Sequence, residues 1–250
     1  MQPVLASWIE VDKRISALIR GETGDDLYGH VLSHLSSHPN ARMLSLGPGE
    51  FAREVPEASI TCLNPNADLQ PEEYDIVFCH GSLHNLVNLE HVVAEIAKSL
   101  RPGGVLIILD VCSRNRYLMW PETREILRPL FKTLPARFRI NHTAYGNPKV
   151  DEDIWEKDPS SATTECPRAE EIVPILNSTF QILQYVPYCS ICQRLLDSMY
   201  GPNYDLSLPL DAAILNWLWE LDLYYVRARK LKPETFFGIY TKKEFTLLQK

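Results

Sequence analysis

Several features are missing from this 250-residue sequence, and each absence excludes a class of protein. It has no run of about 18 apolar residues, so we expect no membrane-spanning helix. It has no basic block, and its net charge of −7 argues against a nucleic-acid partner. The opening MQPVLASWIEVDKR lacks the basic-then-apolar order of a secretion signal. We therefore expect a cytoplasmic protein that acts on a small-molecule substrate, with neither a nucleic-acid nor a membrane partner.

Metal-ligand patterns are also scarce. The six cysteines are scattered, and only Cys189 and Cys192 form a CxxC pair. A zinc site would need a second ligand pair at a suitable spacing, and none is present. His80 and His84 are four residues apart but have no third ligand nearby. We therefore predict no metal site and a reducing compartment.

Strand-like and helix-like segments alternate through the first half of the chain. The apolar runs predict strands at 41–46, 59–63, 74–79 and 105–110, and an amphipathic pattern predicts a helix at 88–100. Such alternation is typical of a parallel sheet with right-handed crossovers. The predicted fold class is therefore α/β, with a mostly parallel Rossmann-like sheet.

The segments on either side of this core suggest additions to it. Helices are predicted at 4–20 and 25–35, separated by breaks at Gly21 and Gly24. Further helices are predicted at 121–133, 168–177, 191–200 and 211–230, and further strands at 179–187 and 236–241. Residues 135–167 show no clear period, which favours a lid or substrate loop.

Neither a repeat nor a linker divides the sequence, so we predict one domain over residues 1–250. Within it, residues 1–38 would form a helical cap and residues 40–112 the core. Residues 113–250 would form an enlarged substrate or lid region with the remaining strands.

The segment SLGPGEF (45–51) is the first candidate site. A glycine turn between a strand and a helix lets the backbone approach a ligand, and the helix N-terminus offers free N–H groups. In an open parallel sheet, ligands bind beside such turns at the carboxyl ends of the strands. The G-x-G pattern alone fits a simple turn equally well.

A second segment is more specific. EYDIVFCHGSLHNL (73–86), a helix and LRPGGVLIILD (100–110) together resemble the fourth and fifth strands of class I S-adenosylmethionine (SAM)-dependent methyltransferases. SLGPGEF falls where that family carries its SAM-binding glycine motif. The resemblance covers about residues 40–112. RYLMWPE, DPSSA, RAEEIVPIL and FFGIYTKK extend it loosely toward a bacterial subgroup of sugar and secondary-metabolite biosynthesis.

The resemblance implies SAM as the cofactor and assigns several residues to it. Gly47 and Gly49 match the first two glycines, whereas Phe51 stands at the third and would crowd the methionine end of SAM. Asn64 stands where the family has the acid that holds the ribose hydroxyls, and Asp68 takes the adenine-facing position. His80, Gly81 and Ser82 match the loop along the methionine part.

One deletion qualifies these assignments. Only NPNADLQPEE (64–73) separates SITCL from the YD strand, where the family usually has an extra helix and strand. Either the second or the third strand is missing, and part of the adenosine wall with it. If SITCL is the third strand, Asn64 loses its assigned role.

His84 and Asp110 are the candidate catalytic residues. A neutral imidazole can take a proton from a hydroxyl or amine, although a histidine that only hydrogen-bonds its own loop is the favoured alternative for His84. Asp110 ends a central strand, where functional side chains point into the crevice, or it caps the following turn.

Arg116, Trp120 and Arg168 are candidate substrate-binding residues, since arginine suits a carboxylate or phosphate. A surface role for the arginines and a packing role for the tryptophan are the alternatives. The Trp- and Tyr-rich segment 217–225 would be core or a dimer surface, which leaves a homodimer open.

The leading functional hypothesis is methyl transfer to an oxygen or nitrogen of a sugar, a nucleotide sugar or a natural-product intermediate. In a second hypothesis the fold keeps its substrate site but catalyses another biosynthetic step, such as a lyase reaction or carbon–carbon coupling. In a third, the chain is a non-catalytic partner subunit with an aromatic helix as its interface.

Overall fold

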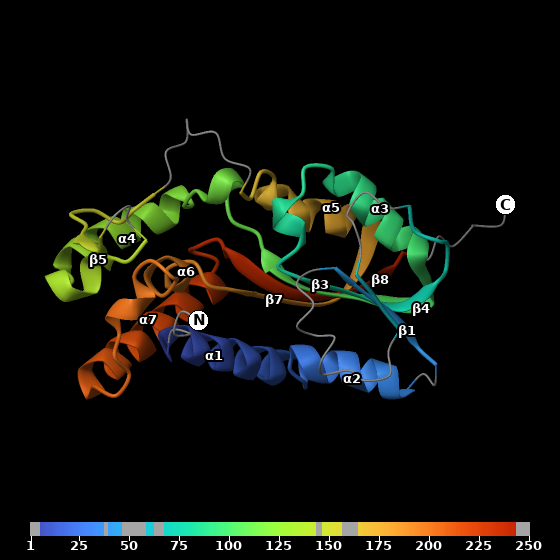
Figure 1. Ribbon diagram of the computed structural model, residues 1–250, viewed down its shortest axis with the longest axis horizontal. Coiled ribbons are helices and arrows are strands. Elements are labelled where there is room, and N and C mark those ends of the chain that lie inside the picture. Colours follow the sequence, from blue (N-terminus) through green and yellow to red (C-terminus); the bar gives the residue numbers. More distant parts are fainter. Residues whose placement is uncertain are drawn as a thin grey trace. The chain divides into compact units, whose positions relative to one another are not determined.

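The computed structural model describes residues 6–37, 40–46, 59–62, 68–143, 147–156 and 165–243 (Figure 1). These form two compact units, each assembled from three stretches of chain. Unit 1 comprises residues 1–18, 117–162 and 187–235, and unit 2 comprises residues 19–116, 163–186 and 236–250. That the whole chain forms a single domain stays a prediction.

Unit 2 contains the central sheet, whose six strands run in the order β2-β1-β3-β4-β8-β7. Its strands are β1 (Arg42–Leu46), β2 (Ser59–Cys62), β3 (Tyr74–His80), β4 (Leu100–Val111), β7 (Phe180–Tyr188) and β8 (Thr235–Lys242). β2, β1, β3 and β4 pair in parallel. The predicted α/β class with a mostly parallel sheet is thus confirmed.

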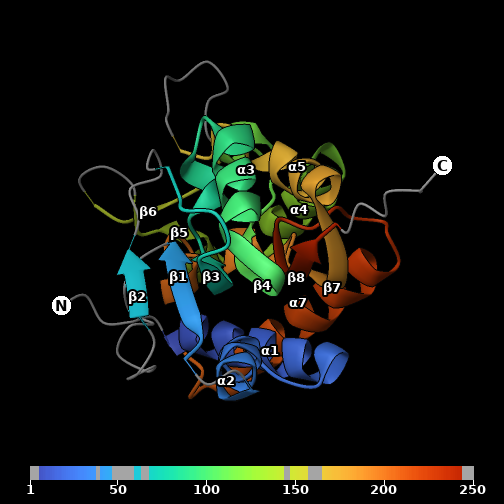
Figure 2. The same cartoon turned by 90° about the vertical axis from the view of Figure 1, so that its right-hand side faces the viewer.

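Helices cover both faces of this sheet. α3 (Leu89–Ser99) and α5 (Ile172–Thr179) lie together on one face, and α2 (Leu27–Ser37) lies on the other (Figure 2). β3 and β4 are apolar along most of their length because they are buried on both faces. Their fully buried residues include Ile76, Val77, Phe78, Leu106 and Ile108.

Residues 101–104, between the predicted helix 88–100 and the predicted strand 105–110, form a bulge inside β4. Tyr74 pairs with Leu100 and Ile76 pairs with Val105, so the chain loops out between the two pairs and then resumes the same ladder. Gly103 has a φ of +77°, and a Cβ on Gly104 would lie 3.0 Å from the Arg101 carbonyl oxygen. The glycines therefore permit the bulge and do not end the strand.

The other predicted helices differ from the observed ones by a few residues at their ends, and the largest differences concern α1 (Ala6–Thr23) and α6 (Cys192–Leu195). α1 continues past Gly21, because one glycine costs a helix only about 1 kcal/mol, and it ends at Gly24, whose φ is +91°. In the predicted helix 191–200, only α6 is helical. Asp197 accepts hydrogen bonds from the N–H groups of Met199 and Tyr200, and this local turn competes with the helix.

Unit 1 is mainly helical. It contains α4 (Pro121–Thr133), α6, α7 (Pro209–Arg227) and most of α1. Within the expected lid, β5 (Ile140–Asn141) and β6 (Lys149–Val150) form a short antiparallel hairpin, which the sequence pattern did not indicate. In the part of the chain that the structure describes, no helix is long and apolar enough to cross a membrane.

Candidate functional site

The carboxyl ends of β3 and β4 hold the predicted catalytic pair. Asp110, near the end of β4, has a side chain that is 0% exposed. Its Oδ2 accepts hydrogen bonds from the N–H groups of Ser82 (3.0 Å) and Leu83 (2.8 Å), and its Oδ1 accepts one from the N–H of Val111 (2.8 Å). The carboxylate therefore caps the turn that follows β3.

His84 lies on that turn and contacts the same carboxylate. Its Nδ1 is 2.6 Å from Oδ1 of Asp110. An ionised carboxylate only accepts hydrogen bonds, so Nδ1 carries the proton and Nε2 is left with its lone pair. The side-chain amide of Asn85 donates to Nε2 at 2.9 Å, and the His84 side chain is 17% exposed. The pair is thus arranged with the basic nitrogen of the imidazole directed away from Asp110.

The residues between β3 and His84 shape the rest of this edge. Gly81 adopts a φ of +57°, and its N–H donates to the Leu109 carbonyl oxygen at 2.9 Å. The His80 ring lies 6.1 Å from that of Phe78. Ser82 Oγ is buried, and it interacts with the thiol of Cys79. The structure thus brings His80, Gly81 and Ser82 together with the predicted catalytic pair.

Cys79 lies one residue before this turn, inside β3. Burial raises the pKa of its thiol well above the usual range, and the negative charge of Asp110 raises it further. The thiol therefore stays protonated at neutral pH, so Cys79 is a packing residue and not a nucleophile.

The predicted adenosine-binding residues are less completely described. Gly47, Gly49, Phe51 and Asn64 lie outside the described residues. β1 ends at Leu46, which pairs with Cys79, the residue before His80. Asp68 is exposed.

Arg168 is held by carboxylates of the protein itself. Its five N–H donors contact Glu90, Glu171 and the Val87 carbonyl oxygen, with charged contacts of 2.5–3.1 Å. The same ion pair lowers the pKa of Glu90 to about 2. The contacts join the start of α5 to α3, so a substrate anion would have to displace one of these carboxylates to reach Arg168.

The other two predicted substrate residues belong to different units. Arg116, in unit 2, is exposed and has a φ of +66°. Its backbone N–H donates to the Cys166 carbonyl oxygen at 2.7 Å. Trp120, in unit 1, donates from its indole N–H to the Pro233 carbonyl oxygen at 3.1 Å, and Lys232 Nζ lies 4.4 Å from its ring centroid. Their role in substrate binding stays a prediction.

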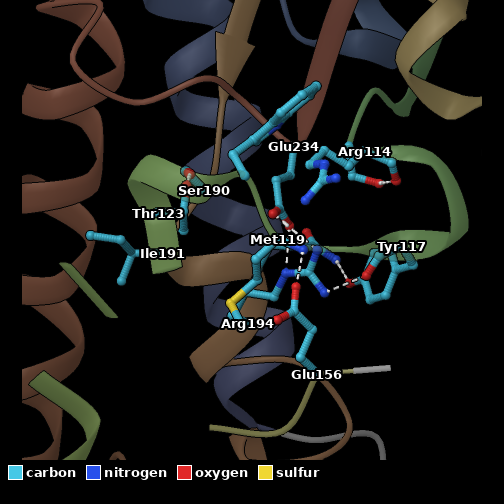
Figure 3. A network of polar contacts seen from close by, with 12 residues as sticks. Arg114, Tyr117, Met119, Thr123, Glu156, Ser190, Ile191, Arg194 and Glu234 are labelled. Atoms are coloured by element: carbon cyan, nitrogen blue, oxygen red, sulfur yellow. Dashed lines mark hydrogen bonds and ion pairs between the residues drawn. The ribbon is translucent and has the colours of Figure 1, made fainter. Parts of the chain in front are cut away.

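Unit 1 contains a buried polar network that sequence reasoning missed (Figure 3). Arg194 Nε lies 2.7 Å from Glu234 Oε2, both side chains are nearly inaccessible, and the guanidinium stacks 4.1 Å from the Tyr117 ring centroid. Burial raises the pKa of Glu234 to about 7, against the opposing effect of Arg194. No sequence motif marks these residues, which lie far apart in the chain.

Clusters of metal-ligating side chains are absent from the described residues, which contain no group of three or more His, Cys, Asp or Glu that could hold a metal ion. At the strand ends, the side chains able to move or hold a proton are those of His84, Asp110 and the neighbouring loop.

An open, mostly parallel sheet with a polar turn at its carboxyl edge defines a Rossmann-like α/β protein. The family model described as "Methyltransferase domain" matches residues 30–108, which include β1, β3, the His84 turn and most of β4. Residues 30–108 thus carry a methyltransferase domain, which confirms the predicted resemblance to class I SAM-dependent methyltransferases and the predicted enzyme class at that level. The bacterial biosynthetic subgroup stays a prediction.

Individual relatives are distant. The ubiquinone/menaquinone biosynthesis C-methyltransferase UbiE of Campylobacter jejuni is 22% identical over 196 residues, which cover 74% of this chain and 77% of the relative. A putative sarcosine dimethylglycine methyltransferase structure from Galdieria sulphuraria has a TM-score of 0.44 and 13% identity, covering 86% of this chain and 83% of its own. The [4+2]-cyclase SpnF has a TM-score of 0.44 and 14% identity, covering 95% and 83%.

The predicted deletion follows an edge strand of the sheet. β2, the SITC segment, pairs directly with β1, with Arg42 opposite Ser59 and Ser45 opposite Cys62. Among the described residues, no strand pairs with the outer edge of β2.

Proposed function

We propose that this chain transfers a methyl group from SAM to a small-molecule acceptor at the carboxyl edge of the unit 2 sheet. The observation that carries the proposal is the Asp110–His84 pair at the ends of β4 and β3. It lies at the edge where open parallel sheets bind ligands, with His84 inside the segment matched by the methyltransferase domain model and Asp110 two residues beyond it.

The described residues are compatible with the methionine part of SAM. The Gly81 turn presents a backbone without a side chain, and the hydroxyl of Ser82 and the ring of His80 lie on the neighbouring residues. A Cβ on Gly81 would lie 3.8 Å from His84 Cε1, so even a methyl group there would begin to cover the imidazole. When bound, SAM supplies an activated methyl group on a sulfonium centre.

The residues of the chain would align the acceptor and remove its proton. Asp110 fixes the tautomer of His84, so that Nε2 can accept a proton from the acceptor while the acceptor atom bonds to the methyl carbon. Asn85 must first give up its hydrogen bond to Nε2. The acceptor atom is left open among oxygen, nitrogen and carbon, because the named relative is a C-methyltransferase.

Sugars, nucleotide sugars and natural-product intermediates form the proposed acceptor class. Arg116 is the nearest exposed cation along the chain after β4, and it would bind a carboxylate or phosphate of such an acceptor. Arg168 could take part only after releasing Glu90 or Glu171.

Calorimetric titration with SAM and S-adenosylhomocysteine tests cofactor use directly. We expect both to bind with micromolar affinity. In methylation assays with a panel of acceptors, His84→Gln should lower kcat by about 10²-fold or more while SAM affinity stays within a few fold. His91→Gln is the matched control, because His91 is an exposed histidine on α3. Equal activity of the two variants would exclude His84 as the base.

The open edge of β2 favours one alternative. In the described residues the sheet stops there, on the side where adenosine would be held. A chain with this fold could have lost SAM and kept its substrate site for a lyase or carbon–carbon coupling step. No SAM binding together with retained affinity for a nucleotide sugar would support this alternative, whereas binding of neither ligand would point to a non-catalytic subunit.

A further inference from the structure

Helix α7 carries apolar side chains on two opposite faces. One face packs into unit 1 through buried residues that include Leu215, Leu218 and Val226. The other face carries Leu210, Ile214, Trp217, Leu221 and Tyr224, which we call the α7 stripe. Leu210, Trp217 and Tyr224 are 64%, 50% and 67% exposed. A helix that is apolar all round is normally covered on both sides.

The spacing of the stripe matches helix pairing. Leu210, Trp217 and Tyr224 recur every seven residues, and Ile214 and Leu221 fall four residues after the first two. This is the pattern of a coiled-coil seam, in which each side chain enters a hole formed by four residues of the facing helix. A stripe of this kind is suited to another helix and not to a flat surface or a small molecule.

Such a hole is present at the C-terminal end of the same helix. A hollow of about 440 Å³ is lined by Glu220, Leu223, Tyr224, Arg227 and Ala228, the i, i+3, i+4, i+7 and i+8 positions of one helix face. At the other end of α7, Leu210 projects into solvent. A knob and a hole on one helix can satisfy each other only across two molecules.

We infer that the α7 stripe is the interface of a homodimer in which two copies of α7 pair in antiparallel orientation about a two-fold axis at Trp217. Placing Leu210 of one copy in the hollow between residues 220 and 227 of the other puts the midpoint of the pair at residue 217. Trp217 then packs against Trp217 of the other copy. Leu210 of the second copy occupies the hollow of the first in the same way, as an isologous interface requires.

The charges at the two ends of α7 agree with this orientation. Arg227, Arg229 and Lys230 make its C-terminal end basic, whereas its N-terminal end carries the exposed Asp205 and the ion pair of Arg137 with Asp211. Antiparallel pairing keeps the basic ends of the two copies apart and places each beside Asp205 of the other copy, and it also aligns the helix dipoles favourably. Parallel pairing would place the three basic residues of each copy side by side.

The area of the stripe sets the expected strength. Five side chains of this size bury on the order of 400 Å² per chain, which places the dimer at the low end of specific interfaces. We therefore expect micromolar dissociation, with the central Trp217 contributing most of the affinity.

Sedimentation velocity of the full chain between about 1 and 200 μM tests the dimer. Wild type should pass from monomer to dimer over this range, and Trp217→Asp should weaken dimerisation by at least 100-fold. Trp155→Asp is the matched control, because Trp155 is an exposed tryptophan of unit 1 outside α7. Circular dichroism checks that each variant is folded. A wild type that stays monomeric at 200 μM, or equal weakening by both variants, would overturn the proposal.

Cysteine cross-linking tests the orientation. Under mild oxidation, Trp217→Cys should form a symmetric disulfide across the axis. Leu210→Cys and Tyr224→Cys should each stay monomeric alone but link to each other when mixed. Symmetric links through Leu210→Cys would instead show parallel pairing and would contradict the antiparallel model.

Discussion

The double role of Asp110, as cap and as partner of His84, leads to a prediction for Asp110→Asn. The amide keeps one oxygen and replaces the other with a donor. The side-chain amide has the lower energy when its oxygen faces the N–H groups of Ser82 and Leu83 and its NH₂ faces His84 and Val111. His84 can adapt by moving its proton to Nε2, but the Val111 N–H loses its acceptor.

The expected loss of stability follows from the one unsatisfied donor, the N–H of Val111. A partly buried N–H without an acceptor costs about 1–3 kcal/mol, so Asp110→Asn should lower the free energy of unfolding by that amount. Because the proton of the imidazole now sits on Nε2, the variant should also lose the base of the proposed reaction. Stability would thus fall moderately while methyl transfer falls by orders of magnitude.

Urea unfolding followed by far-UV circular dichroism measures the first effect. The ¹⁵N chemical shifts of the His84 ring measure the second effect by identifying the protonated nitrogen. Asp68→Asn is the control, because Asp68 is exposed and its replacement should change stability by less than about 0.5 kcal/mol. An unchanged tautomer in Asp110→Asn would refute the reasoning.

Three further predictions concern stability. Gly238→Ala places a Cβ 2.5 Å from the buried Tyr240 ring and should cost about 1–3 kcal/mol in urea unfolding, whereas Gly21→Ala, in open space on α1, should be neutral or stabilising. Arg168→Met should lower the midpoint of thermal unfolding by an amount equivalent to about 1 kcal/mol. If the variant also shows a large rise in KM for the acceptor, Arg168 takes part in substrate binding. The pKa of Glu234 is raised, so the folded state binds the Glu234 proton more tightly than the unfolded state does. The free energy of unfolding of wild type, relative to that of Glu234→Gln, should therefore fall as pH rises from about 4.5 to 7. If pH-dependent unfolding shows this relative stability rising over the same window, the raised pKa of Glu234 is contradicted.

Local sequence patterns were sufficient for the centre of unit 2. The alternation of apolar strands and amphipathic helices predicted β1, β3, β4 and α3 to within one or two residues, apart from the N-terminal part of β4. The prediction placed His84 in the turn after one strand and Asp110 at the end of another, and the pairing of β3 with β4 brings the two together. What it could not supply was the detail of the hydrogen bonds, which decides that Asp110 is a cap and a histidine partner at once.

Sequence patterns failed where contacts are distant or where glycine has two uses. RPGG was expected to end a helix and precede a strand, yet it forms a bulge within β4, because only the pairing partner Tyr74 determines where the ladder begins. The ion pair of Arg194 with Glu234 joins residues forty positions apart, and no local period marks it. Arg168 looked like an anion-binding residue, and its carboxylate partner Glu90 lies on a different helix.

The strand order has a consequence for how the chain is made. β8, synthesised last among the strands, lies between β4 and β7. While the ribosome is still producing residues 112–234, the edge of β4 has no neighbour and exposes its amide and carbonyl groups. Such an edge can recruit strands from other nascent chains. Chaperone dependence should therefore be greatest late in translation, and substitutions that slow the docking of β8 should reduce the yield of active protein more than its final stability.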